Sequence, residues 1–534
     1  MGKSISILKW IICVFCAQSA IAAETPKLER HVMIVVWDGM RPDFVSQENT
    51  PALWKLANEG VVFRNHHAVY PSATNVNGTA IATGVYPGHS GLIANHDYRP
   101  QIDSKHSLDV ETSAVVEKGD ELSGGKYISC PTIAELVQGA GGRTAIATAK
   151  TVGLLLDRNV DLSRAQNCVT LFAGESRPRD AINGIVHALG PFPPFGQFEQ
   201  GDKWTTKALT EVLWKEGLPA FSLLWLGEPD LTQHGSAPGA QAALAAIKSS
   251  DENLAAVLSA LDRQGVRDTT DVFVVSDHGF STIERSVDLR KILKAADLPA
   301  KTEFSDEPKP GEIMLVGNGG SVLFYVIGHD ATVTHRLVEF LQQSDFAGVI
   351  FTKEPMQGTF GLEQAKIDCQ HAPDVMMAFR WKDSKNQFGI SGMIDADWQR
   401  GAGKGTHATL SRFDMHNTLI AAGPDFRRGQ VDDLPSGNID LAPTILHILR
   451  ITSPQQLDGR ILSEAMIKVD RATVGLKPET KAIEATKDFT AGTWRQSLQI
   501  SRVRSTEYLN QSNGVFTLKR KENVPRSSSS PPLD

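Results

Sequence analysis

Acidic and histidine residues follow the ends of several apolar runs in this sequence, and one threonine stands where a helix is predicted to begin. The candidates are Asp38, Thr74, Asp230, His234, Asp277, His278 and His407. Three carboxylates, three imidazoles and one hydroxyl can hold two divalent metals and a nucleophile. This set of side chains predicts metal-dependent hydrolysis of phosphate esters.

The local sequence favours some of these residues as metal ligands more strongly than others. Asp230 and His234 stand four residues apart, so on a helix they share one face and can bind zinc together, although an exposed polar face has the same spacing. Asp277 and His278 directly follow an apolar run, where a buried carboxylate needs a partner unless it caps the next segment. His407, which follows a glycine-rich loop, would by itself be typical of a protein surface.

Thr74 lies at the predicted start of a short helix. Pro71 and Ser72 interrupt the preceding pattern, and residues 75–83 form a helical segment that Gly84 closes. The backbone N–H groups and the dipole at a helix N-terminus favour an anion, so Thr74 could face a phosphate. An ordinary N-cap threonine is the commoner explanation of the same local sequence.

Strand-length apolar runs alternate with helical patterns along the chain. Pro51 occupies the first position of a predicted helix that Gly60 ends, and residues 240–264 repeat the pattern. This alternation predicts an α/β sandwich with a largely parallel sheet, in which ligands bind beyond the carboxyl ends of the strands. Asp38 and Asp277 lie at two such ends.

The helical and strand patterns divide the chain into a catalytic domain and an extension. Two less regular stretches, about 99–125 and 289–400, are predicted insertions that could cap the site and set substrate choice. Segment 439–446 is predicted to be the last core helix. We therefore assign 23–456 to the catalytic domain and 457–534 to a C-terminal extension, whose end, rich in serine and proline, is predicted to be disordered.

Composition narrows the partners of the chain. It has 534 residues, of which 41% are hydrophobic and 22% charged, and its formal net charge is -7. A dedicated nucleic-acid-binding protein is expected to be basic, so that class is disfavoured, whereas small phosphate esters remain suitable substrates. No transmembrane segment is expected in the mature chain.

Residues 1–22 are predicted to be a secretory signal peptide. Lys3 and Lys9 precede the apolar stretch 10–17, and residues 20–22 fit the small-residue cleavage pattern. The apolar stretch is short for a membrane anchor. The chain is therefore expected to be exported, either to a periplasm or to the exterior.

Three cysteines, Cys130, Cys168 and Cys369, remain after removal of that segment. The absence of a Cys-x-x-Cys pattern argues against a zinc–thiolate site and favours structural roles. An oxidising compartment permits one disulfide, for which Cys130 with Cys168 is the favoured pairing.

Taken together and in order, these motifs resemble those of the alkaline phosphatase superfamily, most closely its nucleotide pyrophosphatase/phosphodiesterase branch. The resemblance spans about residues 31–450 and is weak inside the two insertions. The matching segments are 35–43, 50–53, 60–61, 70–77, 83–91, 93–95, 229–235, 276–279, 405–407 and 416–424. The resemblance implies an alkaline-phosphatase-like α/β/α sandwich.

The resemblance also implies a two-metal site with zinc as the expected ion, although the same donors suit manganese or cobalt. Its metal ligands would be Asp38, Thr74, Asp277 and His278 at one site and Asp230, His234 and His407 at the other. Thr74 would be the nucleophile and would form a phospho-threonine that water hydrolyses. Asn95 and the Asn75 backbone N–H would stabilise charge on the phosphoryl oxygens.

The nucleophile narrows the possible activities. Sulfatases of this superfamily mature a Cys or Ser in a Cys/Ser-x-Pro-x-Arg setting, which the segment around Thr74 lacks. Some threonine-using phosphomonoesterases add a Lys and an Arg between the nucleophile and the second metal motif, and Lys150 and Arg158 fall in that interval. A solvated turn explains these two cations equally well.

We therefore expect a phosphodiesterase or nucleotide pyrophosphatase that acts on a small phosphate ester. The alternative is a phosphomonoesterase or a phosphonate hydrolase on the same metal core. A non-catalytic binding protein that keeps the fold is disfavoured, because every candidate metal and nucleophile position is filled.

Overall fold

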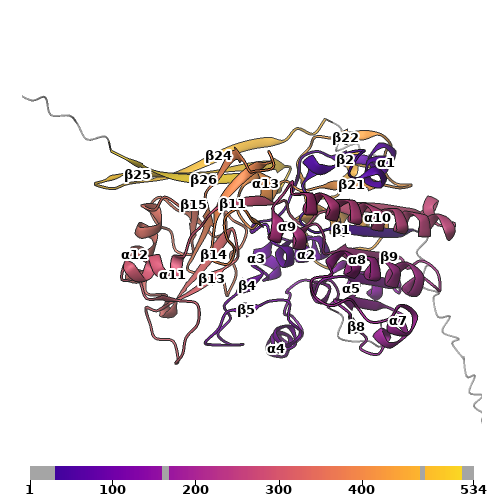
Figure 1. Cartoon of the computed structure of the whole chain (residues 1–534), viewed down its shortest axis with the longest axis horizontal. Helices are drawn as coiled ribbons and strands as arrows, with labels where there is room; N and C mark the ends of the chain where they lie inside the picture. The colour runs from indigo at the N-terminus through magenta and orange to yellow at the C-terminus, as the bar shows by residue number, and fades with distance from the viewer. Residues whose placement is uncertain (1–29, 159–166, 469–474, 520–534) are drawn as a thin grey trace, which may run out of the picture.

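The computed structural model describes residues 30–158, 167–468 and 475–519, and a nine-stranded sheet runs through its centre (Figure 1). The strand order is β22-β2-β21-β10-β1-β9-β6-β7-β8. Strands β10, β1, β9, β6 and β7 are parallel, whereas β21 and β8 run antiparallel to their neighbours. The strands are β1 (His31–Trp37), β2 (Val61–Phe63), β6 (Thr144–Thr148), β7 (Val169–Phe172), β8 (Glu175–Arg177), β9 (Phe221–Leu226), β10 (Thr270–Val275), β21 (Leu419–Ala422) and β22 (Gln430–Asp432). The predicted α/β sandwich with a largely parallel sheet is confirmed.

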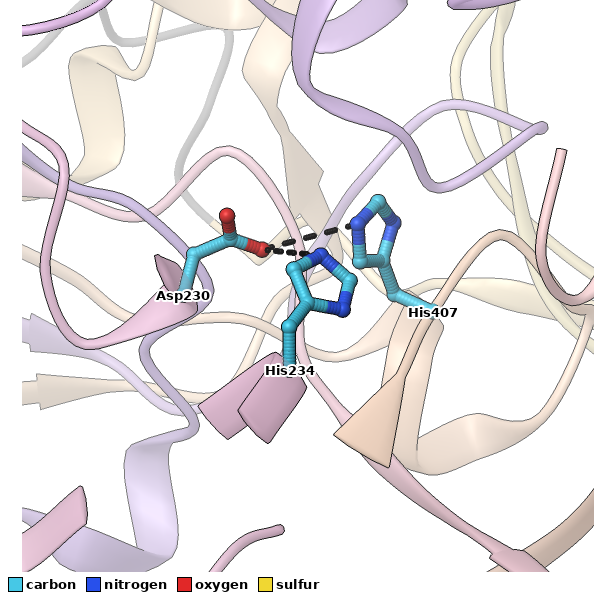
Figure 2. A group of neighbouring side chains, drawn as sticks. All are labelled: Asp230, His234 and His407. Carbon is cyan, nitrogen blue, oxygen red and sulfur yellow. Dashed lines mark ion pairs between the residues drawn. The ribbon is translucent and has the colours of Figure 1, made fainter. Parts of the chain in front are cut away.

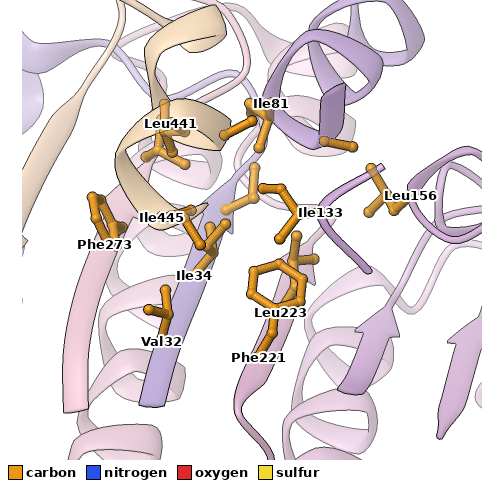
Figure 3. Packing of buried hydrophobic residues seen from close by; sticks show 14 of the residues in the cluster. Val32, Ile34, Ile81, Ile133, Leu156, Phe221, Leu223, Phe273, Leu441 and Ile445 are labelled. Carbon is orange, nitrogen blue, oxygen red and sulfur yellow. The ribbon is translucent and has the colours of Figure 1, made fainter. Parts of the chain in front are cut away.

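Both faces of the sheet are buried, because successive side chains of a strand point to opposite sides. On β1, Val32 and Ile34 belong to one apolar cluster, and Met33 and Val35 belong to another. Figure 3 shows part of the first cluster, in which Ile34 lies beside Ile445. The helices that cover this face are α2 (Thr74–Thr83), α5 (Ile133–Gly139) and α14 (Leu441–Ile448), and those on the other face are α1 (Pro51–Glu59), α8 (Phe198–Lys207) and α10 (Gln241–Arg263).

The helices predicted from the sequence form close to the expected positions. Helix α1 begins at Pro51, and α10 covers most of the segment 240–264. Helix α2 ends at Gly84, which adopts a left-handed conformation with φ 73° that a residue without a Cβ reaches at little cost. Among the described residues, no helix is both long and apolar enough to span a membrane.

The stretch 99–125 and the residues just before it form a small unit beside the sheet. Strands β4 (His96–Asp97) and β5 (Leu108–Asp109) pair antiparallel, and helix α4 (Ser113–Ser123) follows them. Tyr127 fixes the unit, since its hydroxyl donates to the Val110 carbonyl at 2.9 Å. The backbone N–H of Val110 in turn donates to the carbonyl of Asn95 at 3.1 Å, which ties this insertion to a predicted site residue.

The stretch 289–400 contains most of a second, smaller α/β unit (Figure 1). Its six-stranded sheet has the order β12-β13-β14-β17-β15-β16. These elements are β12 (Ala300–Lys301), β13 (Ile313–Gly317), β14 (Ser321–Val326), β15 (Ala347–Thr352), β16 (Phe360–Gly361) and β17 (Val375–Phe379), with helices α11 (Leu289–Ala295) and α12 (Ala331–Gln342). A four-stranded sheet joins this unit to the centre, and its strands are β18 (Trp381–Lys385), β19 (Ser391–Ala396), β11 (Ser281–Ser286) and β20 (Gly405–Thr406).

The C-terminal extension contains a long antiparallel sheet that the sequence analysis did not anticipate. Its strands are β24 (Glu479–Asp488), β25 (Gly492–Val503) and β26 (Thr506–Leu518). Gln496 bonds both backbone groups of Ile350 in the second unit, and Tyr508 donates to Asp440 beside the central sheet at 2.8 Å. The extension therefore fastens the two units together. The predicted signal peptide, 1–22, and the serine-rich end lie outside the described residues.

The expected disulfide between Cys130 and Cys168 is wrong. Cys130 carries a free thiol whose sulfur lies 3.6 Å from the carbonyl oxygen of His89. The sulfur of Cys168 instead accepts from the backbone N–H of Thr144 at 3.3 Å, within the central sheet. The two cysteines therefore lie in different parts of the fold, and their positions in the sequence do not predict this.

Candidate active site

The predicted site residues converge at the carboxyl ends of the central strands. Asp38 follows β1, and Asp277 and His278 follow its parallel neighbour β10. On the other side of β1, strand β9 leads to helix α9 (Asp230–Ser236), which presents Asp230 and His234 on one face. The adjacency of these three parallel strands therefore brings together residues more than two hundred positions apart.

Gly39 allows the chain to turn sharply after the first carboxylate. Its φ of 71° is in the left-handed region, and a Cβ there would lie 2.9 Å from a ring carbon of Phe280. The backbone N–H of Gly39 donates to Oδ1 of Asp277 at 3.0 Å. The turn thus fixes the position of a second carboxylate as well as that of Asp38.

Three residues form what we name the His407 half-site, shown in Figure 2. Nε2 of His234 lies 3.2 Å from Oδ1 of Asp230, and Nε2 of His407 lies 3.5 Å from the same oxygen. Asp230 is 1% exposed and His407 is 6% exposed, whereas His234 is only partly buried. One carboxylate and two imidazoles therefore face a common point at the edge of the protein interior.

Four residues, Asp38, Thr74, Asp277 and His278, form what we name the His278 half-site. Nε2 of His278 lies 3.5 Å from Oδ1 of Asp38 and 3.2 Å from Oδ2 of Asp277. The two carboxylates and the imidazole are fully buried. The rings of His278 and His407 stack with centroids 3.7 Å apart, so the two half-sites adjoin.

The three imidazoles share one orientation. In each, Nδ1 lies 2.8–3.1 Å from a backbone carbonyl oxygen, and the three carbonyls belong to Ser72, Gly279 and Gly405. A carbonyl accepts a hydrogen bond, so Nδ1 carries a proton in each ring, and Nε2 faces a carboxylate. Burial also lowers the pKa of His407 well below its usual value. All three rings therefore present Nε2 as the nitrogen that would bind a metal.

Three carboxylate oxygens of the two half-sites have no hydrogen-bond partner among the described residues and could bind a metal. They are Oδ1 of Asp38, Oδ1 of Asp230 and Oδ2 of Asp277, and all three are buried. Burial raises the pKa of Asp277 to about 7. Buried carboxylate oxygens without partners are costly, and each of these three faces an Nε2 atom. The residues present therefore fit two divalent metals with nitrogen and oxygen ligands.

Thr74 is the first residue of α2, and Ala73 occupies the N-cap position. The N-cap explanation of this threonine is therefore wrong. Its hydroxyl oxygen lies 3.3 Å from Nε2 of His278, and the residue is 3% exposed. The hydroxyl consequently points into the His278 half-site.

The two predicted phosphate-binding groups lie next to one another. The backbone N–H of Asn75 donates to Oδ1 of Asn95 at 2.9 Å, so the carboxamide sits beside the residue that follows Thr74. Asn75 is 2% exposed and Asn95 is partly buried. Asn75 directly follows the candidate nucleophile Thr74, and Asn95 is hydrogen-bonded to Asn75.

Of the two candidate cations, the structure brings only Lys150 into the site. Its Nζ lies 2.8 Å from Oδ2 of Asp38, 3.1 Å from Oδ2 of Asp230 and 3.5 Å from the Thr74 hydroxyl. Burial lowers the pKa of Lys150, but Asp230 and Asp38 outweigh burial and raise that pKa well above its usual value. The ammonium is therefore a permanent cation between the half-sites.

Arg158 reaches neither half-site in the part of the chain that the structure describes. Its guanidinium donates to the carbonyl of Leu154 at 2.7 Å and pairs with Asp120 of helix α4. Its role is to hold α4 against the centre of the molecule.

Three residues near the site were not found from the sequence. Trp225 donates from Nε1 to Oδ2 of Asp38 at 2.9 Å, and Asp202 accepts from the backbone N–H groups of Gly227 and Glu228 just before Asp230. The third is Glu111 of the 99–125 stretch, whose Oε2 is buried and has no hydrogen-bond partner among the described residues. Trp225 lies inside an apolar run, and the two acids lie in segments without a motif, so no local signal separated them from core or surface residues.

Comparison with known proteins places this geometry in context. Residues 32–380 match a family model described as type I phosphodiesterase / nucleotide pyrophosphatase. Venom phosphodiesterase CdcPDE of Crotalus durissus collilineatus is 25% identical over 276 residues, which cover 50% of this chain but only 28% of that protein. Bis(5'-adenosyl)-triphosphatase enpp4 of Xenopus laevis is 22% identical over 444 residues, which cover 80% of this chain and 79% of that protein.

Solved structures show the same architecture at low identity. Murine ectonucleotide pyrophosphatase/phosphodiesterase 5, in an inactive form in complex with AMP, superposes with a TM-score of 0.56 and 16% identity. The match covers 80% of this chain and 96% of that chain. The human counterpart superposes with a TM-score of 0.56 and 17% identity. These likenesses establish a shared fold.

Proposed function

Because the chain belongs to the type I phosphodiesterase/nucleotide pyrophosphatase family, we propose that it hydrolyses phosphate diesters, including nucleotide-like ones, with Thr74 as nucleophile. The observation that carries the proposal is the convergence of three carboxylates and three imidazoles in two adjoining half-sites, one of which contains the Thr74 hydroxyl. Two bound divalent cations, of which zinc is the expected kind, would supply Lewis acidity and lower the pKa of that hydroxyl.

The residues of the chain divide the reaction between them. Thr74 would form a bond from its hydroxyl oxygen to phosphorus as the bond to the leaving oxygen breaks. The hydroxyl proton would pass to solvent, and the leaving oxygen would take up a proton from solvent. Asn95 would bind the non-bridging oxygens, where charge develops, and the Asn75 backbone N–H would join it once released from Oδ1 of Asn95. Water would then cleave the threonine–phosphorus bond and return the hydroxyl. Two displacements at phosphorus predict net retention of configuration.

A second activity, hydrolysis of phosphomonoesters or phosphonates, is favoured by one observation. Nζ of Lys150 lies 3.5 Å from the Thr74 hydroxyl, where an extra cation would stabilise a doubly charged phosphoryl group. Arg158, which was expected to act with it, is bound to Asp120 instead. The diester therefore remains the first proposal.

The test compares bis-p-nitrophenyl phosphate with p-nitrophenyl phosphate, using the full chain loaded with zinc and the same protein treated with a chelator. Faster, chelator-sensitive hydrolysis of the diester is expected. Faster hydrolysis of the monoester would favour the second activity, and hydrolysis that the chelator leaves unchanged would contradict the metal-dependent mechanism.

We also propose that the chain is exported. The support is the basic and then apolar pattern of residues 1–22, which lie outside the described residues. Detection of the mature chain starting near residue 23 in the periplasmic or culture fraction would agree with this proposal, and retention of residues 1–22 in the cytoplasmic fraction would contradict it.

A further inference from the structure

Asn438 is a buried residue that contacts both the His278 half-site and helix α2. It begins the short turn Asn438–Asp440 that leads into helix α14, and it is fully buried. Its Nδ2 donates to the backbone carbonyl of Asp277 at 2.6 Å and to Oδ1 of Asn77 at 2.9 Å. One amide nitrogen therefore joins a candidate metal ligand to the helix that begins with Thr74.

The atoms around this carboxamide fix its orientation. Oδ1 of Asn438 accepts from Nε2 of His66 at 2.9 Å and from Nδ2 of Asn417 at 3.2 Å. A carboxamide has two N–H groups and an oxygen with two lone pairs, and all four have partners here. The backbone carbonyl of Asp277 can only accept, so a flipped carboxamide would place two oxygens against each other. The group is therefore held in one orientation.

Asn77 extends this link to the segment just before the candidate nucleophile. It lies three residues after Thr74 on α2. Its Oδ1 also accepts from the backbone N–H of Val69 at 2.7 Å. Its Nδ2 lies 3.1–3.3 Å from three backbone carbonyl oxygens, those of Val69, Pro71 and Ala73. Segment 69–73 therefore folds around the Asn77 side chain and leads directly into Thr74.

The same segment supports the His407 half-site. The carbonyl of Ser72 accepts from Nδ1 of His407 at 2.8 Å, so the segment that Asn77 holds also orients a ligand of the other half-site. Within the part of the chain that the structure describes, Asn438 is hydrogen-bonded to no side chain of either half-site. Its influence on the site would therefore pass through the backbone at Asp277 and through Asn77.

We propose that Asn438 is a positioning residue for the reaction at Thr74, because its carboxamide fixes the chain at Asp277 against helix α2. The inference rests on the proposed function, in which Thr74 attacks phosphorus. A displacement of about 1 Å in reacting groups can lower a rate by about 10²-fold. Asn438 thus acts on the chemical step, whereas other residues hold the substrate and the metals.

The experiment measures kcat and KM of the full, zinc-loaded chain with bis-p-nitrophenyl phosphate. Asn438→Leu keeps the approximate shape of the side chain and removes its two donors. The kcat of this variant should fall about 10²-fold, while KM stays within about threefold of the wild type. Its zinc content should match that of the wild type, since Asn438 contacts the backbone of Asp277 and not its carboxylate.

Gln496→Met is the matched control. Gln496 is also a buried carboxamide that joins two parts of the fold, through both backbone groups of Ile350. Its replacement should lower the unfolding temperature but leave kcat within about twofold of the wild type. A loss of kcat as large as that of Asn438→Leu would mean that any lost buried carboxamide slows the enzyme, and would overturn the inference.

Two further variants test the same link. Asn438→Ala leaves a polar cavity that water can fill, so it replaces Asn438→Leu if that variant does not fold, with the same expected split between kcat and KM. Asn77→Ala removes the other end of the link and should lower kcat at least as far. The double variant Asn77→Ala/Asn438→Ala should be no slower than Asn77→Ala, because residues that act through one link are not additive.

The outcomes that contradict the inference are distinct from failure of the proposed function. If the wild type hydrolyses the diester, the inference is overturned by an unchanged kcat in the Asn438 variants, by a change confined to KM, or by losses that multiply in the double variant. Loss of zinc from the Asn438 variants would assign this residue to metal retention and overturn it as well. Absence of hydrolysis by the wild type would instead overturn the proposed function, and this inference with it.

Discussion

The two half-sites are built differently although they adjoin. In the His278 half-site, Asp38, Asp277 and His278 follow the ends of two neighbouring parallel strands and are fully buried. The His407 half-site combines two residues of helix α9 with His407, which follows the 289–400 stretch, and His234 stays partly exposed. The pairing of β1 with β10 thus positions the carboxylates of the His278 half-site, whereas the His407 half-site is complete only because the chain after residues 289–400 comes back to helix α9.

This difference predicts a division of labour. The buried half-site holds the Thr74 hydroxyl, the proposed nucleophile, in a water-poor environment, where electrostatic effects are strong. The more open half-site suits the leaving oxygen and the incoming water, which must exchange with solvent. The predictions below test whether the half-sites are in fact distinct.

The largest effect is expected from Thr74→Ala. Removing the nucleophile should lower turnover by about 10⁴-fold or more, while zinc content and unfolding temperature stay close to those of the wild type. Thr79→Val is the control, because the Thr79 hydroxyl lies on the same helix and has no hydrogen-bond partner among the described residues. Substantial residual turnover in Thr74→Ala would remove this residue from the role of nucleophile.

The half-sites themselves are compared by Asp277→Asn and His234→Gln. Each should reduce zinc content, measured by mass spectrometry, to about one ion per chain, since each removes a ligand from one half-site only. Turnover should fall about 10³-fold for Asp277→Asn and about 10²-fold for His234→Gln, because a metal in the His278 half-site would activate Thr74. Loss of both ions in either variant would mean that the half-sites act as one unit.

Asn95→Ala should have a smaller effect on turnover, about 10²-fold, because it removes one donor to the phosphoryl oxygens. Zinc content should be unchanged, since Asn95 contacts the Asn75 backbone and not a carboxylate or imidazole of either half-site. Release of zinc from this variant would show that Asn95 supports the metal centre instead.

The buried half-site should also affect how the stability of metal-free protein depends on pH. The pKa of Asp277 is raised from 3.8 to about 7 by burial, so between these values the folded state binds more protons than the unfolded state. Its contribution to the free energy of unfolding therefore decreases as pH rises from about 4 to about 7. Asp277→Asn should gain stability over the wild type by up to about 4 kcal/mol across this interval. Urea unfolding at several pH values measures this difference, and a constant difference would contradict it.

The smallest effect on turnover is expected from Arg158→Gln. This guanidinium pairs with Asp120 outside both half-sites, so turnover of mono- and diesters should stay within about twofold of the wild type. The free energy of unfolding should fall by about 3 kcal/mol, because a buried ion pair loses one partner. A selective loss of monoester hydrolysis would place Arg158 in the substrate site after all.

Much of the architecture was accessible from local patterns. Pro51 and Gly60 marked the ends of a helix, and the four-residue spacing of Asp230 and His234 matched helix α9. Apolar runs followed by acidic residues indicated strand ends. The long C-terminal sheet was missed, because most of β24 is exposed and polar residues such as Gln496 share the buried face of β25 with Trp494 and Leu498.

The sequence by itself determined which side chains are available and on which strand ends and helix faces they lie, since periodicity and turn residues report local backbone geometry. Only the tertiary structure decided that Lys150 reaches the site, that Arg158 does not, and that Cys130 stays a free thiol. The reason is physical. Distances between such residues depend on strand order, sheet register and the packing of insertions, which no local spacing encodes.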